Sequence, residues 1–267
     1  MGKRFLSLLA CLLFAACMFA GVCAAEQGGM ITSLSEVKPE IFQAQMDDGS
    51  GRPAVQPHYP GVLSGLIEHG LKGVLDVRQQ HPVFGNAALD KTVLSAIQGS
   101  LSAFTAERLE DYSDEVADKD TPVRLWQHQG KYLLFSSGPD CVTVHLSSYV
   151  YRGGVHGGNT HTALVLSRKT GRQLGLGDMF ADANMAVSLM SQWATEKLAA
   201  SLGAAFEKAG AEPRPENFTR IIPVQDGLVM VFEEYQVAPY ASGMQVVKMP
   251  LNALEKAGPK PGVWGAR

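Results

Sequence analysis

A stretch rich in glycine and histidine constrains this chain more than any other feature of its sequence. It runs from Tyr151 to Thr162 and carries four glycines and two histidines between two runs that are typical of β-strands. Glycine at this density in a strand-rich region predicts backbone with positive φ, or a surface that another group approaches closely. We therefore expect a sharp reversal from one strand into the next, fixed by the structural residues Gly153, Gly154, Gly157 and Gly158.

Alternating side chains on either side of this stretch predict further strands. From Cys141 to Tyr151, apolar residues at every second position alternate with Thr143, His145 and Ser147, which predicts one buried face and one wetter face. Residues 160–167 form the next predicted strand. Earlier in the chain, two strand-like runs flank Gln129-Gly130, and this pattern predicts a tight hairpin over residues 123–136.

Two segments with apolar residues every three or four positions predict amphipathic helices. The first follows a strand near residue 75, has Asn86 as its cap and ends near Leu109, and the acidic stretch that follows, to residue 120, predicts a loop. The second is capped by Asp182 or Asn184 and ends at Gly210. Three strand-like runs within residues 218–250 then predict a final antiparallel group.

This order of elements predicts an α+β fold with antiparallel sheets and two long helices. We expect two βα-containing halves packed together, residues 73–150 and 151–254. Residues 26–72 lack a sustained period and contain several prolines and glycines, which predicts a linker or loosely packed arm. Residues 255–267 are expected to form a tail.

The first 25 residues predict a secretory signal peptide. Lys3 and Arg4 precede an apolar run, and small residues lie just before Glu26. Two alternatives stay open: a lipoprotein processed before Cys17, and an uncleaved anchor, because the apolar run is about as long as the shortest membrane span. Each alternative predicts an exported, periplasmic or extracellular protein that touches a membrane only through its anchor. Three of the four cysteines lie in this segment, so Cys141 has no intrachain partner for a disulfide.

The charge balance argues against nucleic acid as a partner. The formal net charge is -3, and without Lys3 and Arg4 there are 21 basic against 26 acidic residues. A protein that binds nucleic acid normally concentrates lysine and arginine on one face to neutralise phosphates. The basic residues here are scattered, and the mild acidity suits a cationic partner better.

No residue pattern predicts a metal, a cofactor or a catalytic group. His145, His156 and His161 could offer nitrogen ligands to zinc, but no cysteine or carboxylate follows His145 before Asp178 to complete a site. The glycines lack the Lys-Ser/Thr pair and the following helix of a phosphate-binding loop. Glu233 and Glu234 are neighbours in a predicted strand, so we expect them on opposite faces, where they cannot act as a paired acid and base.

Several motifs together resemble a family of envelope proteins. The glycine-histidine motif YRGGVHG begins at Tyr151, TGRQL begins at Thr170, DMF begins at Asp178, and FEEYQVAPYASG runs from Phe232 to Gly243. In this order they resemble the extracytoplasmic domain of the RsiV-type anti-sigma factors, a domain that also accompanies the peptidoglycan deacetylase PdaC. The resemblance covers about residues 73–254, and its second motif includes Pro239 and Gly243 as structural residues.

The resemblance implies a binding module rather than a catalyst. In the anti-sigma factors the domain recognises lysozyme, and in the deacetylase it is an accessory to a separate catalytic domain. Only Met1 to Arg4 precede the hydrophobic run here, and no deacetylase domain follows, so neither sigma-factor control nor deacetylation is expected.

We therefore expect a non-enzymatic binding protein of the cell envelope. Its expected partners are lysozyme or another envelope protein, or a peptidoglycan-type glycan. The candidate ligand contacts lie on the surface that the glycine-histidine stretch shapes with the second motif: Tyr151, His156, His161, Tyr235 and Tyr240. Two alternatives stay open: a glycan hydrolase with its site around His156, His161 and Glu233, and a structural envelope protein that binds its own copies.

Overall fold

The computed structural model describes residues 29–42, 59–118 and 120–265. The predicted signal peptide, which includes Cys17, lies outside these ranges. So do residues 26–28 and 43–58 of the expected arm. Within them, no helix is long and apolar enough to cross a membrane.

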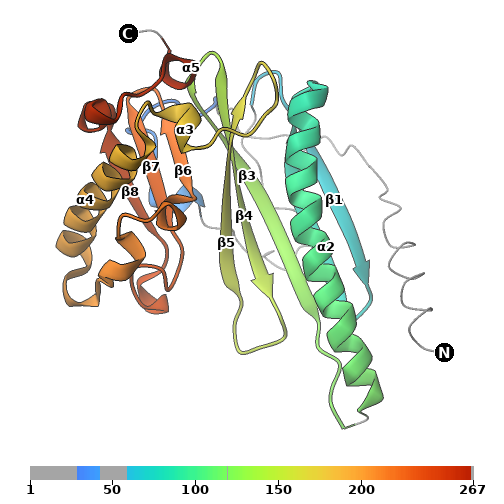
Figure 1. Cartoon of the computed structure of the whole chain (residues 1–267). Coiled ribbons are helices and arrows are strands. Elements are labelled where there is room, and N and C mark those ends of the chain that lie inside the picture. Colours follow the sequence, from blue (N-terminus) through green and yellow to red (C-terminus); the bar gives the residue numbers. More distant parts are fainter. Residues whose placement is uncertain (1–28, 43–58, 119, 266–267) are drawn as a thin grey trace.

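The larger sheet has five strands in sequence order, and one helix covers it (Figure 1). All neighbouring strands are antiparallel except the second and third, which are parallel and joined by the helix α2 (Ala87–Ala117). A parallel pair needs such a crossover connection. The strands are β1 (Leu63–Leu71), β2 (Leu75–Val83), β3 (Trp126–Gly138), β4 (Cys141–Tyr151) and β5 (Gly158–Ser167).

The start of α2 follows from local sequence, but its end does not. Asn86 caps the helix, and its Oδ1 accepts hydrogen bonds from the amides of Ala88 (3.1 Å) and Leu89 (3.2 Å). The loop predicted after Leu109 is wrong, because α2 continues to Ala117. Arg108 and Glu115 are both buried and pair at 2.7 Å, which anchors the acidic last turns against the sheet.

The smaller sheet is antiparallel and carries the second long helix. It consists of β6 (Ile221–Val224), β7 (Gly227–Phe232) and β8 (Gln245–Pro250), and α4 (Ala183–Leu202) packs on it. Asp182 caps α4 by accepting from the Met185 amide at 2.9 Å. The helix ends at Gly203, which has φ +55°, and not at the predicted Gly210. Gly210 serves a different purpose, because a Cβ there would overlap the Gln236 carbonyl.

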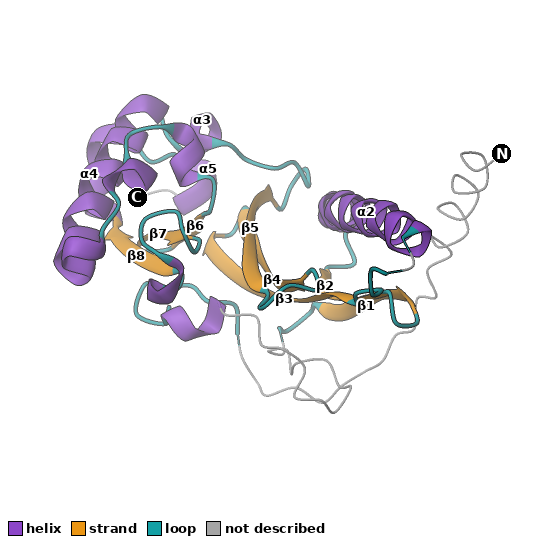
Figure 2. Ribbon diagram, turned by 90° about the horizontal axis from the view of Figure 1, so that it is seen from below, coloured by secondary structure: helices purple, strands orange, loops and turns teal. Residues whose placement is uncertain are grey.

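Three apolar clusters form the core. One lies between α2 and the five-stranded sheet, and a second lies between α4 and the three-stranded sheet. The third joins the two sheets: Ile222 and Val229 of the smaller sheet pack with Leu133 and Ala163 of the larger one, together with Phe42. Figure 2 shows α2 and α4 at opposite ends of this arrangement. The predicted α+β fold is therefore confirmed.

The contact between the sheets overturns the expected wet face of β4. Thr143, His145 and Ser147 are all fully buried. The smaller sheet and the segment that ends at Phe42 cover this face, and neither is apparent from the alternation within β4 itself.

Two segments expected to lie outside the fold are part of it. Residues 63–71 form β1, paired with β2 along its whole length, so the predicted arm is wrong there. Ile31 also bridges β3, donating to the Leu134 carbonyl at 3.0 Å and accepting from the Ser136 amide at 3.0 Å. These segments are held by backbone pairing, which needs no regular side-chain pattern.

The expected C-terminal tail also packs against the core. Val263 and Trp264 of α5 (Pro261–Trp264) are buried, and the Trp264 indole donates to the Val224 carbonyl at 3.0 Å. The short helices α3 (Leu176–Met179) and η6 (Leu251–Ala257) lie beside α4.

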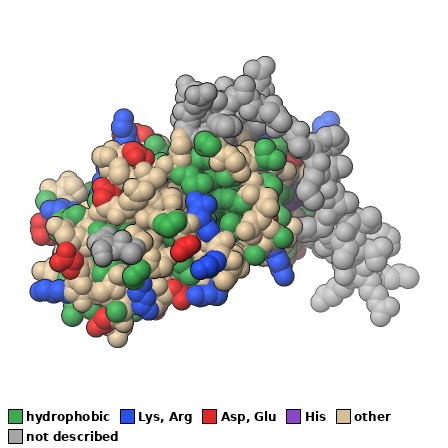
Figure 3. Space-filling model, turned by 90° about the horizontal axis from the view of Figure 1, so that it is seen from above, with side chains coloured by type: hydrophobic (Ala, Val, Ile, Leu, Met, Phe, Trp, Pro, Cys, Tyr) green, Lys and Arg blue, Asp and Glu red, His purple; other side chains and the backbone are tan. Residues whose placement is uncertain are grey.

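In the view from above, charged side chains of both signs are interspersed and hydrophobic ones gather nearer the middle (Figure 3).

The predicted hairpin at Gln129-Gly130 is wrong, and so is the division after residue 150. Strand β3 runs through Gly130 without a turn, because Gly130 pairs with Gln79 of β2 on one side and with Ser148 of β4 on the other. The glycine leaves room for the Gln79 side chain, which occupies the space that a Cβ would need. Strands β4 and β5 pair along almost their whole length, so residues 150 and 151 belong to one sheet. The physical units are the α2 sheet, which ends with β5, and the α4 sheet.

Candidate functional site

Two segments distant in sequence meet at one end of the larger sheet. One is the turn between β4 and β5, at the lower end of that sheet in Figure 1, and the other is the connection between β7 and β8. The Tyr240 hydroxyl donates to the Gly157 carbonyl at 3.2 Å, and the Gly157 amide donates to the Tyr149 hydroxyl at 3.0 Å. Glycine is required at 157 because a Cβ would overlap the Tyr149 ring.

The meeting point presents a row of three adjacent rings. His156 stacks on Tyr240 with centroids 4.7 Å apart, and Tyr240 lies 5.5 Å from Tyr235. Tyr235 is 66% exposed, and Val155, next to His156, is fully exposed. We call Val155, His156, Tyr235 and Tyr240 the aromatic ledge.

Tyr235 is held in an unusual backbone conformation. Its φ is +66°, the one positive value among the non-glycine residues that the structure describes. A bulky residue in this region is strained and persists only where its surroundings fix it. Here the next residue does so, because the Gln236 amide donates to the Glu233 carbonyl at 3.1 Å, and the Gln236 side chain donates to the Gly210 and Asn217 carbonyls.

The remaining motif residues shape the two segments without joining the ledge. Gly153 has φ +74° and lies against Arg124, whereas a side chain at Gly154 or Gly158 would meet open space. The Tyr151 hydroxyl donates to the Gly154 carbonyl at 2.9 Å. In the second motif, Pro239 precedes the 3₁₀ turn η5 (Tyr240–Ser242), and Gly243 ends it with φ +65°.

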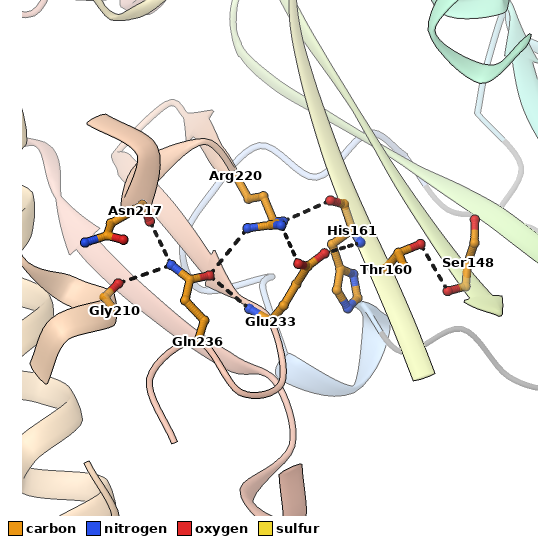
Figure 4. Close-up of polar contacts among 8 residues, drawn as sticks. All are labelled: Ser148, Thr160, His161, Gly210, Asn217, Arg220, Glu233 and Gln236. Atoms are coloured by element: carbon orange, nitrogen blue, oxygen red, sulfur yellow. Dashed lines mark hydrogen bonds and ion pairs between the residues drawn. The ribbon is translucent and has the colours of Figure 1, made fainter. Parts of the chain in front are cut away.

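A network of side chains behind the ledge fixes the second segment to β5 (Figure 4). The Arg220 guanidinium pairs with Glu233 and donates to the His161 carbonyl at 3.0 Å, and Glu233 accepts from the His161 amide at 2.8 Å. The side chains of Arg220 and Glu233 thus satisfy the backbone of an edge strand, as a neighbouring strand would. We call Arg220, Glu233 and the His161 backbone the joint.

Glu234 reaches the same strand, which corrects a prediction. Strand β7 ends at Phe232, so Glu233 and Glu234 follow the strand instead of alternating within it. Glu234 accepts from the Asn159 amide group at 3.2 Å, two residues from His161. Both carboxylates therefore hold the segment to β5 and do not lie on opposite faces of a sheet.

His161 lies away from the ledge, in the interior. Its ring is 4% exposed, stacks 5.4 Å from that of His145, and points away from the joint (Figure 4). Burial, followed by the charges of Arg220 and Lys131, lowers the pKa of His161 to about 4. His156 is on the ledge instead, with its Nδ1 3.0 Å from the Gly157 carbonyl. The three histidines are thus divided, and the described ranges hold no cluster of three His, Cys, Asp or Glu that could bind a metal.

This geometry offers contact area instead of paired proton-transfer groups. A hydrolase site would need His156 and Glu233 to act on one substrate, whereas Glu233 is engaged by Arg220 and the His161 amide, and His156 by Tyr240 and Gly157. Stacked rings beside an exposed valine are typical of a binding surface.

Sequence reasoning missed the residues of the network that supports Tyr235. Arg220 directly precedes β6, and Asn217 lies in a 3₁₀ turn, and neither position shows a periodic or compositional signal. Gln236 lies inside the second motif, which is the only signal that could have found it.

Comparisons with known proteins match the segment of the smaller sheet to a family and find solved structures with a similar fold. Residues 177–252 match the family described as "Protein of unknown function (DUF3298)". A DUF3298 family protein from Pseudomonas aeruginosa PAO1 is similar in structure, with a TM-score of 0.55, 20% identity, and coverage of 77% of this chain and 97% of its own. A DUF3298 family member from Bacteroides fragilis NCTC 9343 has a TM-score of 0.53, 16% identity, and coverage of 75% and 94%.

No curated protein matches the chain. The two structural relatives share less than a quarter of their residues with it, so they establish the fold alone. The segment that forms α4 and the three-stranded sheet therefore matches the DUF3298 family, within a chain that shares the fold of solved DUF3298 family proteins.

Proposed function

We propose that this protein is a non-enzymatic binding protein of the cell envelope, and that it contacts its partner through the aromatic ledge. The observation that carries the proposal is the row of three rings across two segments: His156 stacks on Tyr240, and Tyr240 packs at a tilt against Tyr235, which is two-thirds exposed. Tyrosine supplies a large, rigid contact area with a polar end, and it is enriched among the residues that dominate protein interfaces.

The way Tyr235 is held supports the proposal that its ring contacts a partner and does not serve to fill the core. A side chain that only filled space would be buried, but this ring is exposed on a strained backbone. Strain of this kind concentrates at binding and switch regions because the surrounding structure must offset it. The Gln236 contacts and the joint provide that support, at a position where the ring contributes little to the core.

A protein partner fits the ledge best, and lysozyme is the first candidate. The resemblance of the two motifs to the RsiV-type domain supports this choice, and the mild acidity of the chain suits a basic partner. Export under the predicted signal, with release or with lipidation at Cys17, would place the ledge where such a partner is found.

Binding measurements on the exported chain test the proposal. Lysozyme and soluble peptidoglycan fragments would be passed separately over immobilised protein. We expect lysozyme to bind, and Tyr235→Ala and Tyr240→Ala each to weaken binding by about tenfold or more, as for residues at the centre of an interface. Binding of the fragments alone would transfer the proposal to a glycan.

A matched pair of variants distinguishes binding at the aromatic ledge from non-specific hydrophobic binding. Val155 and Leu63 are both apolar and strongly exposed, but Leu63 is on β1, away from the two segments that form the ledge. Val155→Ser should weaken binding, whereas Leu63→Ser should leave it unchanged. The proposal fails if neither ligand binds, or if binding survives both tyrosine substitutions.

A further inference from the structure

A contiguous set of buried polar side chains lies between the two sheets, outside the ledge. Lys131, Ser147 and His161 are direct neighbours across β3, β4 and β5, and His145 is two residues from Ser147 on β4. Within the described part of the chain, the Ser147 hydroxyl and all four ring nitrogens of the two histidines are buried without a hydrogen-bond partner. Native proteins leave few such groups, and each one indicates a particular role or a stored instability.

The surroundings of the two rings disfavour a positive charge on either. Phe42 of η1 (Pro39–Phe42) packs edge-on against His145 with centroids 4.8 Å apart, and the rings of the two histidines stack on each other. The positive charges that act on them are those of Lys131 from β3 and Arg220 from the start of β6. The Glu233 carboxylate, after β7, accepts from the His161 amide and is already paired with Arg220.

The backbone of His161 connects this interior to the ledge. Its amide and carbonyl are the two groups on β5 that the joint holds, and its side chain is the one that stacks on His145. Glu233 lies two residues before Tyr235, and Asn159, two residues from His161, holds Glu234. A change that moves His161 therefore acts directly on the segment that presents Tyr235 and Tyr240.

We infer that the His145–His161 pair is an acid-sensitive switch: protonation of either ring loosens the contact between the sheets, releases the joint and disassembles the aromatic ledge. The last step rests on the proposed function, because it makes partner binding strong near neutral pH and weak in acid. The earlier steps concern the fold alone.

The direction follows from linkage. Burial lowers the pKa of His161 to about 4, and burial followed by the charge of His161 lowers that of His145, whereas an opened state restores the ordinary value near 6.5. Between these limits the open state binds more protons, so it gains population as the pH falls. At pH 5, His161 alone shifts the equilibrium toward the open state by about 20-fold relative to pH 7, and His145 adds to this shift.

Hydrogen exchange of the full chain without any ligand tests the switch. Exchange rates would be corrected for their intrinsic pH dependence and followed in peptides that cover residues 157–163 and 233–243. We expect protection of both peptides to fall by about tenfold or more between pH 7 and pH 5 in the natural chain. In the double variant His145→Phe/His161→Phe this loss should disappear, because phenylalanine cannot take up a proton. The substitution removes only ring nitrogens that have no hydrogen-bond partner among the described residues.

His128 supplies a matched control. Burial also lowers its pKa to about 4, but it packs against Phe104 of α2 on the other face of the sheet. The variant His128→Phe should keep the pH response of the two peptides. The inference is overturned if protection does not fall in the natural chain, or if it falls equally in the double variant.

A measurement without variants covers the case in which the double variant fails to fold. The ring signals of His145 and His161 in the natural chain would be titrated by NMR. Titration near the ordinary pKa, with the peptides still protected, would overturn the switch.

Lysozyme binding at pH 7 and pH 5 then separates the two proposals. Absence of binding at both values with the expected loss of protection would refute the proposed function alone. Strong binding at both values with unchanged protection would refute the switch alone.

Discussion

The two faces of the five-stranded sheet treat their buried histidine and serine side chains in opposite ways. On the α2 face, His128 lies 2.9 Å from Gln79 Oε1, which also accepts from Ser148 at 2.9 Å. On the face toward the smaller sheet, His145, His161 and Ser147 are equally buried but have no such partners among the described residues. The comparison shows that burial alone does not reveal what a polar residue contributes, because its partners decide whether it stabilises the fold.

The same contrast extends to charge. On the α2 side, the guanidinium of Arg108 is fully buried, and its Nε and Nη2 donate to Glu115 and to the carbonyls of Val74 and Arg124, while its Nη1 has no partner among the described residues. Between the sheets, Lys131 is partly buried, and no carboxylate of the described ranges pairs with it. We therefore expect substitutions on the α2 face to cost stability at pH 7, and matched substitutions between the sheets to cost little at that pH.

The largest effect should come from breaking the buried ion pair under α2. Glu115→Ala leaves the Arg108 charge buried without its carboxylate, which costs about 3–5 kcal/mol of unfolding free energy, as for other buried pairs. Urea unfolding measures this loss. Glu107→Ala is the control, because its pair with Arg152 is half exposed on both sides, and it should cost at most about 1 kcal/mol. Equal losses in the two variants would contradict the buried pair.

Acid should weaken both faces, but for separable reasons. The pKa values of His128 and His161 are both lowered to about 4, so each contributes stability that is complete above about pH 6.5 and is lost as the pH falls toward 4. From pH 7 to pH 4.5 each should cost about 2.5 kcal/mol. His161→Phe should remove its share without loss at pH 7, whereas His128→Phe should also lose stability at pH 7. Unfolding midpoints are measured for both variants at the two pH values. Equal midpoints for the two variants at each pH would contradict the difference between the two faces.

A single substitution on the α2 face should show how much its hydrogen bonds contribute. Gln79→Leu leaves His128 and Ser148 buried without their shared acceptor, and an unsatisfied buried group costs about 1–3 kcal/mol. Thermal unfolding at pH 7 measures this change. An unaffected melting temperature would mean that the two groups find other partners.

The smallest effect concerns two adjacent serines that point to opposite faces. Ser148→Ala removes the bond to Gln79 and should cost about 1 kcal/mol. Ser147→Ala removes a buried hydroxyl that has no partner, so it should be neutral within about 0.5 kcal/mol or slightly stabilising. A larger loss at Ser147 than at Ser148, measured by urea unfolding, would reverse the comparison.

The candidate site was partly accessible from sequence. The glycine-histidine stretch and the second motif each drew attention to residues that the structure brings together, namely His156, Tyr235 and Tyr240. The contact between the two segments joins positions more than eighty residues apart in the sequence, such as Gly157 and Tyr240. A local sequence pattern cannot predict a contact over such a separation. His161 and Tyr151 had the same local signals but lie away from the ledge, because strand register and the Gly154 contact direct them elsewhere.

The sequence by itself determined the elements whose causes are local. The Asn86 and Asp182 caps, the apolar period of α2, and the reversal between β4 and β5 each depend on residues a few positions apart. Only the tertiary structure decided that α2 extends past Leu109, that β3 runs straight through Gly130, and that the polar face of β4 is buried. Each of these results depends on groups brought from elsewhere in the chain, namely Arg124 for α2, the neighbouring strands β2 and β4 for β3, and Phe42 for β4. Local propensity cannot carry that information, because the energies that decide these cases arise only when distant residues meet.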